Sequence, residues 1–184
     1  MSSIQAHGGR RLTLQQFADL PPESSFIHEL DEGILRVSPR PVKLHQLALG
    51  RLFTQIETQL PPELLVFPEI DVDLGLEPPT VRVPDLTVTA TTTVYDDTFT
   101  AAKDVVLVVE VVSPGSRRVD LLTKPEQYAR AGIPHFWRVV PGYPMSVTVF
   151  DLVDGNYQEV MHVQDVLKVD SPCPLLIYLD ALLP

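Results

Sequence analysis

Two periodicities of hydrophobic and polar residues alternate along this chain and predict a mixture of helices and strands. Helical signals lie within residues 13–20, 41–60 and 117–131. Apolar or alternating runs predict strands at residues 25–30, 34–38, 65–74, 81–90, 104–112, 134–140, 146–152 and 157–163. Several strands in the middle of a chain, with helices around them, are typical of a mixed α/β sheet.

Turn and cap residues mark several ends of these elements. Thr13 and Gln16 have the spacing of a capping box that opens the first helix. The turn residues 31–33 separate two strand-like runs and predict a β-hairpin, and Gly132 occupies the position that a helix C-terminal cap prefers. Because no interdomain linker is visible, we expect the 184 residues to form one domain, with residues 1–12 as a flexible tail.

Composition excludes several classes of protein. Hydrophobic residues make up 45% and charged residues 21% of the chain, which are globular rather than disordered values. The single cysteine, Cys173, rules out an internal disulfide and indicates a reducing compartment. No run approaches the roughly 18 apolar residues of a membrane span, and the N-terminus lacks an apolar core of signal-peptide length. We therefore expect a cytoplasmic protein that is not bound to a membrane.

The formal net charge of −10 argues against a protein that coats nucleic acid, because such proteins are usually basic. Positive charge is nevertheless concentrated in two segments. Residues 33–51 contain four cations and no acid, and residues 113–138 contain five cations and two acids. Two basic segments on an acidic protein could steer an anionic ligand to a local site. The alternative is that these are ordinary solvated side chains.

Two carboxylates interrupt apolar strands and are the first candidates for chemistry. Glu110 lies in the apolar run 105–112, which we place centrally in the sheet, and Asp85 interrupts the run 81–88. A charged carboxylate in such a place needs a cation or several hydrogen-bond donors. If the two strands pair, the carboxylates lie about 5 Å apart. Hard oxygen ligands at that spacing favour Mg²⁺ or Mn²⁺. The alternative for Glu110 is a strand end that reaches solvent at Ser113.

Lys124 is the third candidate, because a lysine on the helix after the Glu110 strand can reach back over the end of the sheet. A lysine beside a metal and a phosphate can orient water and stabilise developing negative charge. The alternative is a surface lysine. Thr123 and Glu126 also have the capping-box spacing, so the helix can start at Thr123, and Pro125 then leaves the direction of Lys124 open.

Other polar residues are expected to be structural. His45 shares a helical stripe with Leu49, Leu52 and Ile56, which favours a packed histidine over a role in a site. Tyr128 is expected to pack in the core.

Several motifs occur in an order that resembles the Uma-type restriction endonuclease family, a bacterial branch of the PD-(D/E)XK nucleases. The motifs are ELDEG at 29–33, SPR at 38–40 followed by His45, Pro84-Asp85, VVEVVSP around Glu110, Lys124 with YARAGI at 128–133, and FWRVV at 136–140. The resemblance covers about residues 14–155. It implies a restriction-endonuclease-like core: a mixed central sheet flanked by helices, with an N-terminal helix and a β-hairpin.

The resemblance also implies the residues of a site. It implies Asp85, Glu110 and the main-chain carbonyl of Val111 as ligands of Mg²⁺ or Mn²⁺. The lysine of the superfamily normally stands two residues after the glutamate, where this chain has valine. The resemblance therefore implies that the lysine has moved onto the next helix, as Lys124. Glu29 on the hairpin would be an additional acidic residue of the site, with an exposed hairpin acid as the alternative.

Two functions are open at this point. The first is a Mg²⁺-dependent endodeoxyribonuclease, a hydrolase that cleaves DNA phosphodiester bonds by a metal-activated water. The resemblance further implies a homodimer, because nucleases of this fold often cut both strands as dimers. The second function is a non-catalytic binding or scaffold protein that retains the fold, which the net charge and Pro125 favour.

Overall fold

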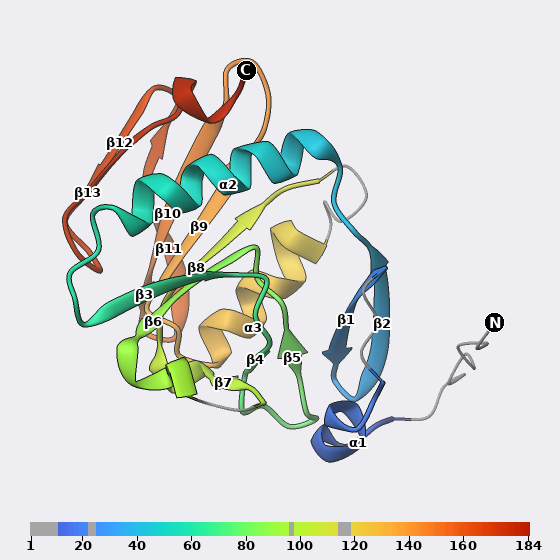
Figure 1. Cartoon of the computed structure of the whole chain (residues 1–184). Coiled ribbons are helices and arrows are strands. Elements are labelled where there is room, and N and C mark those ends of the chain that lie inside the picture. Colours follow the sequence, from blue (N-terminus) through green and yellow to red (C-terminus); the bar gives the residue numbers. More distant parts are fainter. Residues whose placement is uncertain (1–10, 22–24, 96–97, 114–118) are drawn as a thin grey trace.

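The computed structural model describes residues 11–21, 25–95, 98–113 and 119–184, and Figure 1 shows the chain as a mixed α/β fold. Its strands are β1 (Phe26–Asp31), β2 (Ile34–Pro39), β3 (Leu64–Pro68), β4 (Val72–Asp73), β5 (Val81–Arg82), β6 (Leu86–Ala90), β7 (Thr100–Ala101), β8 (Val105–Val111), β9 (His135–Val140), β10 (Ser146–Val153), β11 (Asn156–Val163), β12 (Val166–Val169) and β13 (Leu175–Tyr178). Its helices are α1 (Leu14–Ala18), α2 (Lys43–Glu57) and α3 (Lys124–Arg130), with 3₁₀ turns at Thr91–Tyr95, Ala102–Asp104 and Asp180–Leu182 and a π-helical turn at Val119–Thr123.

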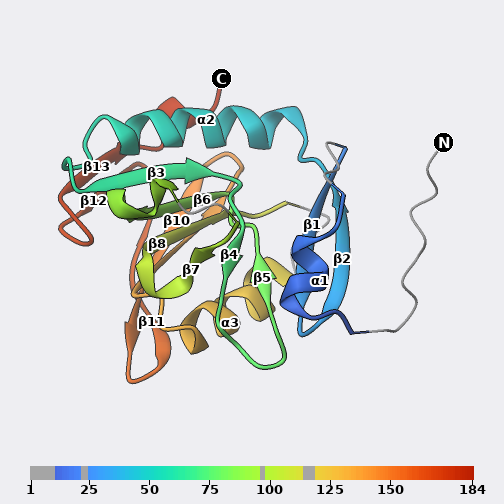
Figure 2. The same cartoon turned by 60° about the horizontal axis from the view of Figure 1, so that its bottom comes forward.

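The main sheet has six strands in the order β11-β10-β9-β8-β6-β3. Strand β8 lies in its interior, antiparallel to β6 and parallel to β9, so the sheet is mixed, as predicted. A helix covers each face: Figure 2 shows α2 on one side of the sheet and α3 on the other. Leu107 and Val109 pack with α2, whereas Val108 packs with α3. Burial on both faces explains why β8 is a nearly continuous apolar run.

A second sheet has the order β2-β1-β5-β4-β7 and carries the predicted hairpin. Strands β1 and β2 pair through Asp31 and Ile34, and the turn between them has positive φ at Glu32 and Gly33. The predicted capping box at α1 is confirmed, since the Thr13 hydroxyl accepts a hydrogen bond from the Gln16 backbone N–H and the Thr13 backbone N–H donates to Oε1 of Gln16.

The predicted N-terminal tail falls partly outside the described residues, which begin at residue 11. Leu12 is buried with Phe17, Leu30 and Val81, and its N–H donates to the carbonyl of Gly33 at 2.6 Å. Leu12, at the end of the segment predicted as a tail, therefore belongs to the packed part of the chain.

Two predicted strands each prove to be two strands in different sheets. The segment 65–74 divides into β3 of the main sheet and β4 of the second sheet, and 81–90 divides into β5 and β6. Pro68 and Pro84 lie at these divisions, and proline cannot donate a ladder hydrogen bond. The chain consequently changes sheets at each proline, which places Asp85 just before β6 instead of within a strand.

The third helix also differs from its prediction. The π-helical turn at 119–123 runs directly into α3, so Thr123 has a helical backbone conformation (φ −73°, ψ −50°) and its side chain makes no capping hydrogen bond. The capping box predicted at Thr123 is therefore wrong. Residues 117 and 118 of the predicted helix lie outside the described part of the chain. The cap at Gly132 is confirmed by its φ of +80° and its N–H bond to the Ala129 carbonyl.

No helix in the described part of the chain is long and apolar enough to cross a membrane.

Candidate functional site

Asp85 lies beside the end of β8 because β6 and β8 pair. Leu86 stands opposite Val109 in this antiparallel pair, so the preceding residue reaches the level of Glu110. The Val111 N–H donates to Oδ2 of Asp85 at 2.6 Å, and Nε2 of His45 lies 3.2 Å from the same oxygen. The strand pairing on which the site was predicted is therefore present, and Asp85 is held by a main-chain donor and a histidine.

Glu110 is buried in the sheet and touches the candidate lysine. The residue is 2% exposed, so the alternative of a strand end that reaches solvent is wrong. Nζ of Lys124 lies 2.9 Å from Oε1 and 3.1 Å from Oε2 of this carboxylate. The Tyr128 hydroxyl donates to Oε1 at 2.6 Å. Lys124 is itself only 8% exposed, so it is not a surface lysine, and it reaches back over the sheet although Pro125 follows it.

Glu29 enters the same cluster from β1. Its Oε1 lies 3.2 Å from Nζ of Lys124 and accepts a hydrogen bond from the Val83 N–H at 3.1 Å. Its Oε2 lies 3.1 Å from Nη1 of Arg82. The alternative of an exposed hairpin acid is wrong, because Glu29 is buried. Lys124 thus bridges two carboxylates that are 81 positions apart in the sequence, Glu29 and Glu110.

Arg82 of β5 contacts residues of the hairpin and of α3 next to this cluster. Its Nη2 lies 2.6 Å from Oδ1 of Asp31, and its Nε donates to Oε1 of Gln127 at 2.8 Å. Gln127 in turn donates to Asp31 at 3.0 Å. Burial acts to raise the pKa of Asp31, but the hydrogen bond from Gln127 and the charges of Arg82 and Arg36 outweigh it and lower the pKa. Sequence reasoning missed Arg82, although a cation between Val81 and Val83 was a usable signal.

Two residues expected to be structural also contact the candidate carboxylates. His45 is buried, as predicted, but it pairs with Asp85. Burial acts to lower the pKa of His45. The hydrogen bond with Asp85 and the charge of that carboxylate together outweigh burial, so the pKa is raised above its usual value. Tyr128 packs against Phe136 and binds Glu110 through its hydroxyl. Burial, followed by the charges of Glu110 and Glu29, raises the Tyr128 pKa well above its usual value.

The donor chemistry of the cluster suits a hard divalent cation. Asp85 and Glu110 offer carboxylate oxygens from neighbouring strand positions, and Oδ1 of Asp85 accepts no hydrogen bond within the described residues. Mg²⁺ and Mn²⁺ prefer such oxygen ligands. Within the same part of the chain, no three His, Cys, Asp or Glu side chains converge on one point. A cation at this place would therefore rely on Asp85 and on a carboxylate that Lys124 already contacts.

The two basic segments behave differently. In residues 33–51, Arg36 pairs with Asp31 and Arg40 pairs with Glu69, so these cations are engaged within the protein. In the second segment, residues 117 and 118 lie outside the described residues. Arg130 and Arg138 line a hollow of about 370 Å³ on the α3 side of the sheet, and the Arg138 guanidinium lies 4.9 Å above the ring of Phe150. The backbone of Arg138 is the register partner of Glu110 on the neighbouring strand β9, while its guanidinium extends over Phe150 of β10.

Comparison with known proteins agrees with this fold. A family model named Uma2 and described as "Putative restriction endonuclease" matches residues 14–179. The fold is similar to the crystal structure of a protein described as "a putative nuclease belonging to DUF820" from Anabaena variabilis ATCC 29413. The two share 19% sequence identity and a TM-score of 0.71 over 93% of this chain and 97% of that chain, which is a likeness of fold. No protein of curated function matches the sequence. The predicted family and fold are thus confirmed, and the chain belongs to the Uma2 family.

Proposed function

We propose that this protein is an endonuclease that hydrolyses DNA phosphodiester bonds with the help of Mg²⁺ or Mn²⁺. The observation that carries the proposal is the position of Lys124, whose ammonium contacts both Glu29 and Glu110. Asp85 is bonded to the backbone one residue beyond Glu110. Glu29 of β1, Glu110 of β8 and Lys124 of α3 therefore form one cluster, and Asp85, just before β6, is bonded next to it. The family description supports the same reaction class.

In this proposal Asp85, Glu110 and the carbonyl of Val111 hold the divalent cation. When bound, such a cation neutralises charge on the phosphate and lowers the pKa of a water nucleophile. The Val111 N–H and His45 fix the orientation of Asp85, and the Tyr128 hydroxyl fixes Glu110.

Lys124 has a separate role in the proposal. Its ammonium donates to an oxygen of the scissile phosphate and stabilises the negative charge that develops in the transition state. Glu29 positions the ammonium from the opposite side, since its Oε1 lies 3.2 Å from Nζ. Arg82 keeps Glu29 in place through its own ion pair at 3.1 Å.

One observation favours the alternative of a non-catalytic binding or scaffold protein. Both oxygens of Glu110 are bonded to groups of the protein itself, Lys124 and Tyr128. A buried carboxylate that is satisfied in this way can serve the fold alone. Metal titration separates the two functions, because a scaffold has no need of a divalent cation.

The experiment is a cleavage assay at low salt with Mg²⁺ or Mn²⁺, on single-stranded and duplex DNA. Low salt is chosen because phosphate contacts weaken as salt rises, and this acidic protein has few of them. We expect Lys124→Ala to lower the rate about a hundredfold, as for the loss of one charge-stabilising donor. Lys103→Ala, at a side chain that is 81% exposed, is the matched control and should cut like the wild type.

Calorimetry completes the test. The wild type should bind Mn²⁺ and the Asp85→Ala variant should not. If metal binds normally while every DNA substrate stays intact, the scaffold replaces the nuclease. If Lys124→Ala cuts like the wild type, Lys124 loses its assigned role.

Four further assignments stay predictions. A single domain and a cytoplasmic location rest on the sequence pattern and composition, and a homodimer and a bacterial source rest on the resemblance. Light scattering that shows a monomer at high micromolar concentration would contradict the homodimer.

A further inference from the structure

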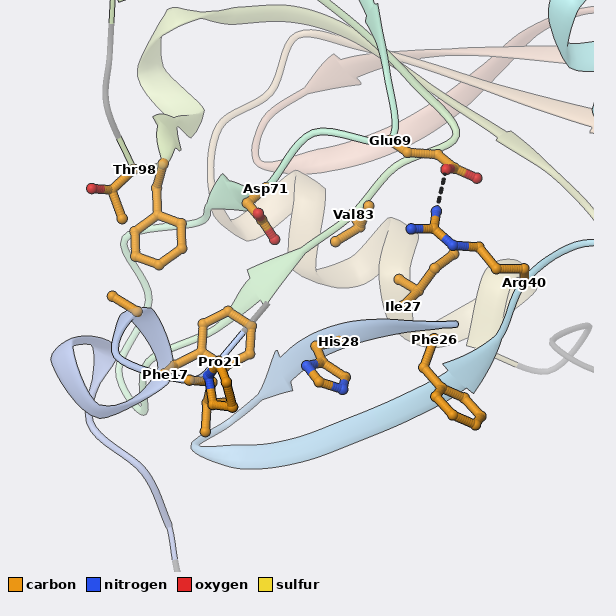
Figure 3. Close-up of a pocket in the computed structure, with 13 residues that line it drawn as sticks. Phe17, Pro21, Phe26, Ile27, His28, Arg40, Glu69, Asp71, Val83 and Thr98 are labelled. Carbon is orange, nitrogen blue, oxygen red and sulfur yellow. Dashed lines mark hydrogen bonds and ion pairs between the residues drawn. The ribbon is translucent and has the colours of Figure 1, made fainter. Parts of the chain in front are cut away.

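A second feature of the molecule is a hollow of about 370 Å³ between α1, β1 and the segments that flank β4 and β7. Figure 3 shows Phe17 and Pro21 on one side of it, His28 on the hairpin strand, and the pair of Arg40 and Glu69 at the other end. Its volume is within the range of pockets that hold small organic ligands.

This hollow adjoins the candidate site through three connections. His28 precedes Glu29 on β1, and its side chain lines the hollow. Val83 also lines it and donates its N–H to Glu29. Glu69 lines it and donates its N–H to the main-chain carbonyl of Asp85 at 3.2 Å. A group seated in the hollow would therefore belong to the part of a substrate next to the scissile phosphate.

The charges around the hollow do not suit a phosphate. Two carboxylates, Glu69 and Asp71, line it, and Arg40 already pairs with Glu69 at 2.6 Å. Burial, followed by the charge of Glu29, raises the pKa of Asp71 against an opposing contribution from His28, in keeping with the two carboxylates that line the hollow. A neutral group is the better occupant.

The walls offer both an aromatic surface and hydrogen-bonding atoms. Phe17 and Phe99 stack at a centroid distance of 6.0 Å at one end of the hollow, and Phe26, which is 38% exposed, lies near Arg40 at the other end (Figure 3). Nε2 of His28 is buried and has no hydrogen-bond partner within the described residues. Asp71 projects into the same space in Figure 3. A nucleobase matches this arrangement, because it combines a flat face that stacks on aromatic rings with an edge of donors and acceptors.

We infer that this hollow holds the base of an unpaired nucleotide beside the scissile phosphate, so that the substrate is DNA with an unpaired nucleotide and not an intact duplex. A base within a duplex is covered on both faces and paired along its edge, so it cannot enter a pocket unless it leaves the stack. This inference rests on the proposed nuclease function and adds the strand state of its substrate.

The test fills the hollow without removing any of its walls. Ala18 is an exposed residue of α1 that lines the hollow, so Ala18→Trp should occupy it at little cost in folding. Gln15→Trp is the matched control, since Gln15 is exposed on the same helix and does not line the hollow. Far-ultraviolet circular dichroism and thermal melts confirm that both variants are folded.

The first readout needs neither metal nor cleavage. Millimolar deoxynucleosides are titrated into ¹⁵N-labelled protein, and the ring nitrogens of His28 are followed by NMR. We expect His28 shifts in the wild type and in Gln15→Trp, and none in Ala18→Trp. The absence of a shift in the wild type, or an equal shift in Ala18→Trp, overturns the inference.

The second readout is cleavage of one sequence as single strand and as duplex. We expect the wild type to prefer the single strand, and Ala18→Trp to cut it about tenfold more slowly, as for the loss of one stacked base. Equal cutting of both substrates, or unchanged cutting by Ala18→Trp, overturns the inference while the nuclease function stands. If no protein cuts any DNA, the nuclease function fails, and the NMR titration still decides whether the hollow binds a base.

Discussion

Replacement of Lys124 by methionine removes the cation that bridges two buried carboxylates and keeps most of the side-chain volume. Loss of one partner from a buried ion pair costs about 3–5 kcal/mol, because the remaining charge is left in a poorly solvated place. Here the cost is reduced, since Arg82 still pairs with Glu29 and Tyr128 still donates to Glu110. We therefore expect the free energy of unfolding to fall by about 2–4 kcal/mol in metal-free buffer.

The same change should increase stabilisation by metal. If Lys124 and a divalent cation share Glu110, the variant no longer competes with the cation for this carboxylate. A ligand at a hundredfold excess over its Kd adds about 2.7 kcal/mol to the stability of the folded state. We expect Mn²⁺ to raise the stability of Lys124→Met by more than it raises that of the wild type, and so to restore part of the loss.

Urea unfolding with EDTA and with Mn²⁺ measures both effects. Lys103→Met is the control, and its exposed ion pair predicts a change of less than about 0.5 kcal/mol. A loss of less than about 1 kcal/mol at Lys124 would contradict the buried ion pair. The expected loss of stability in EDTA, combined with no greater stabilisation of Lys124→Met than of the wild type by Mn²⁺, would refute the idea that Glu110 holds the metal.

Two further predictions concern charges around the site. Asp31 has a lowered pKa in the folded state, so its charged form stabilises the fold above the unfolded pKa and this contribution disappears as pH falls through the folded value. Asp31→Asn should thus lower the urea midpoint at pH 7 and have little effect near pH 2, and an equal loss at both values would contradict the linkage. Arg130 and Arg138 line the hollow on the α3 side of the main sheet, and replacement of both by alanine should reduce the slope of log affinity for DNA against log salt by about 2. An unchanged slope in a fluorescence anisotropy titration would show that DNA does not contact these two arginines.

Contacts between distant residues account for what sequence reasoning missed. His45 shares an apolar helical stripe and Tyr128 is a buried aromatic residue of α3, and the sequence predicts for both only that they pack. Each packs as expected and also directs one polar atom at a carboxylate, Nε2 at Asp85 and the hydroxyl at Glu110. Helical periodicity shows which face is buried, but it carries no information on which polar atom of the facing strand lies opposite.

The sequence by itself determined the elements whose signals are local. The capping box at Thr13, the hairpin turn at 31–33, the cap at Gly132 and the doubly buried run of β8 all depend on residues a few positions apart. Such patterns act through backbone conformation and side-chain periodicity, which any short segment carries with it.

Only the tertiary structure decided where the chain changes sheets and what surrounds the carboxylates. The sequence pattern predicts one continuous strand across Pro68 and another across Pro84. An apolar run has the same pattern whether its residues pair in one sheet or in two. The ion pairs of Arg82 with Glu29 and Asp31 depend on the pairing of β5 with β1. The ion pair between Lys124 and Glu110 likewise depends on the packing of α3 on the sheet. Ion pairs between residues so distant in sequence depend on the three-dimensional packing of the sheets, which no local pattern encodes.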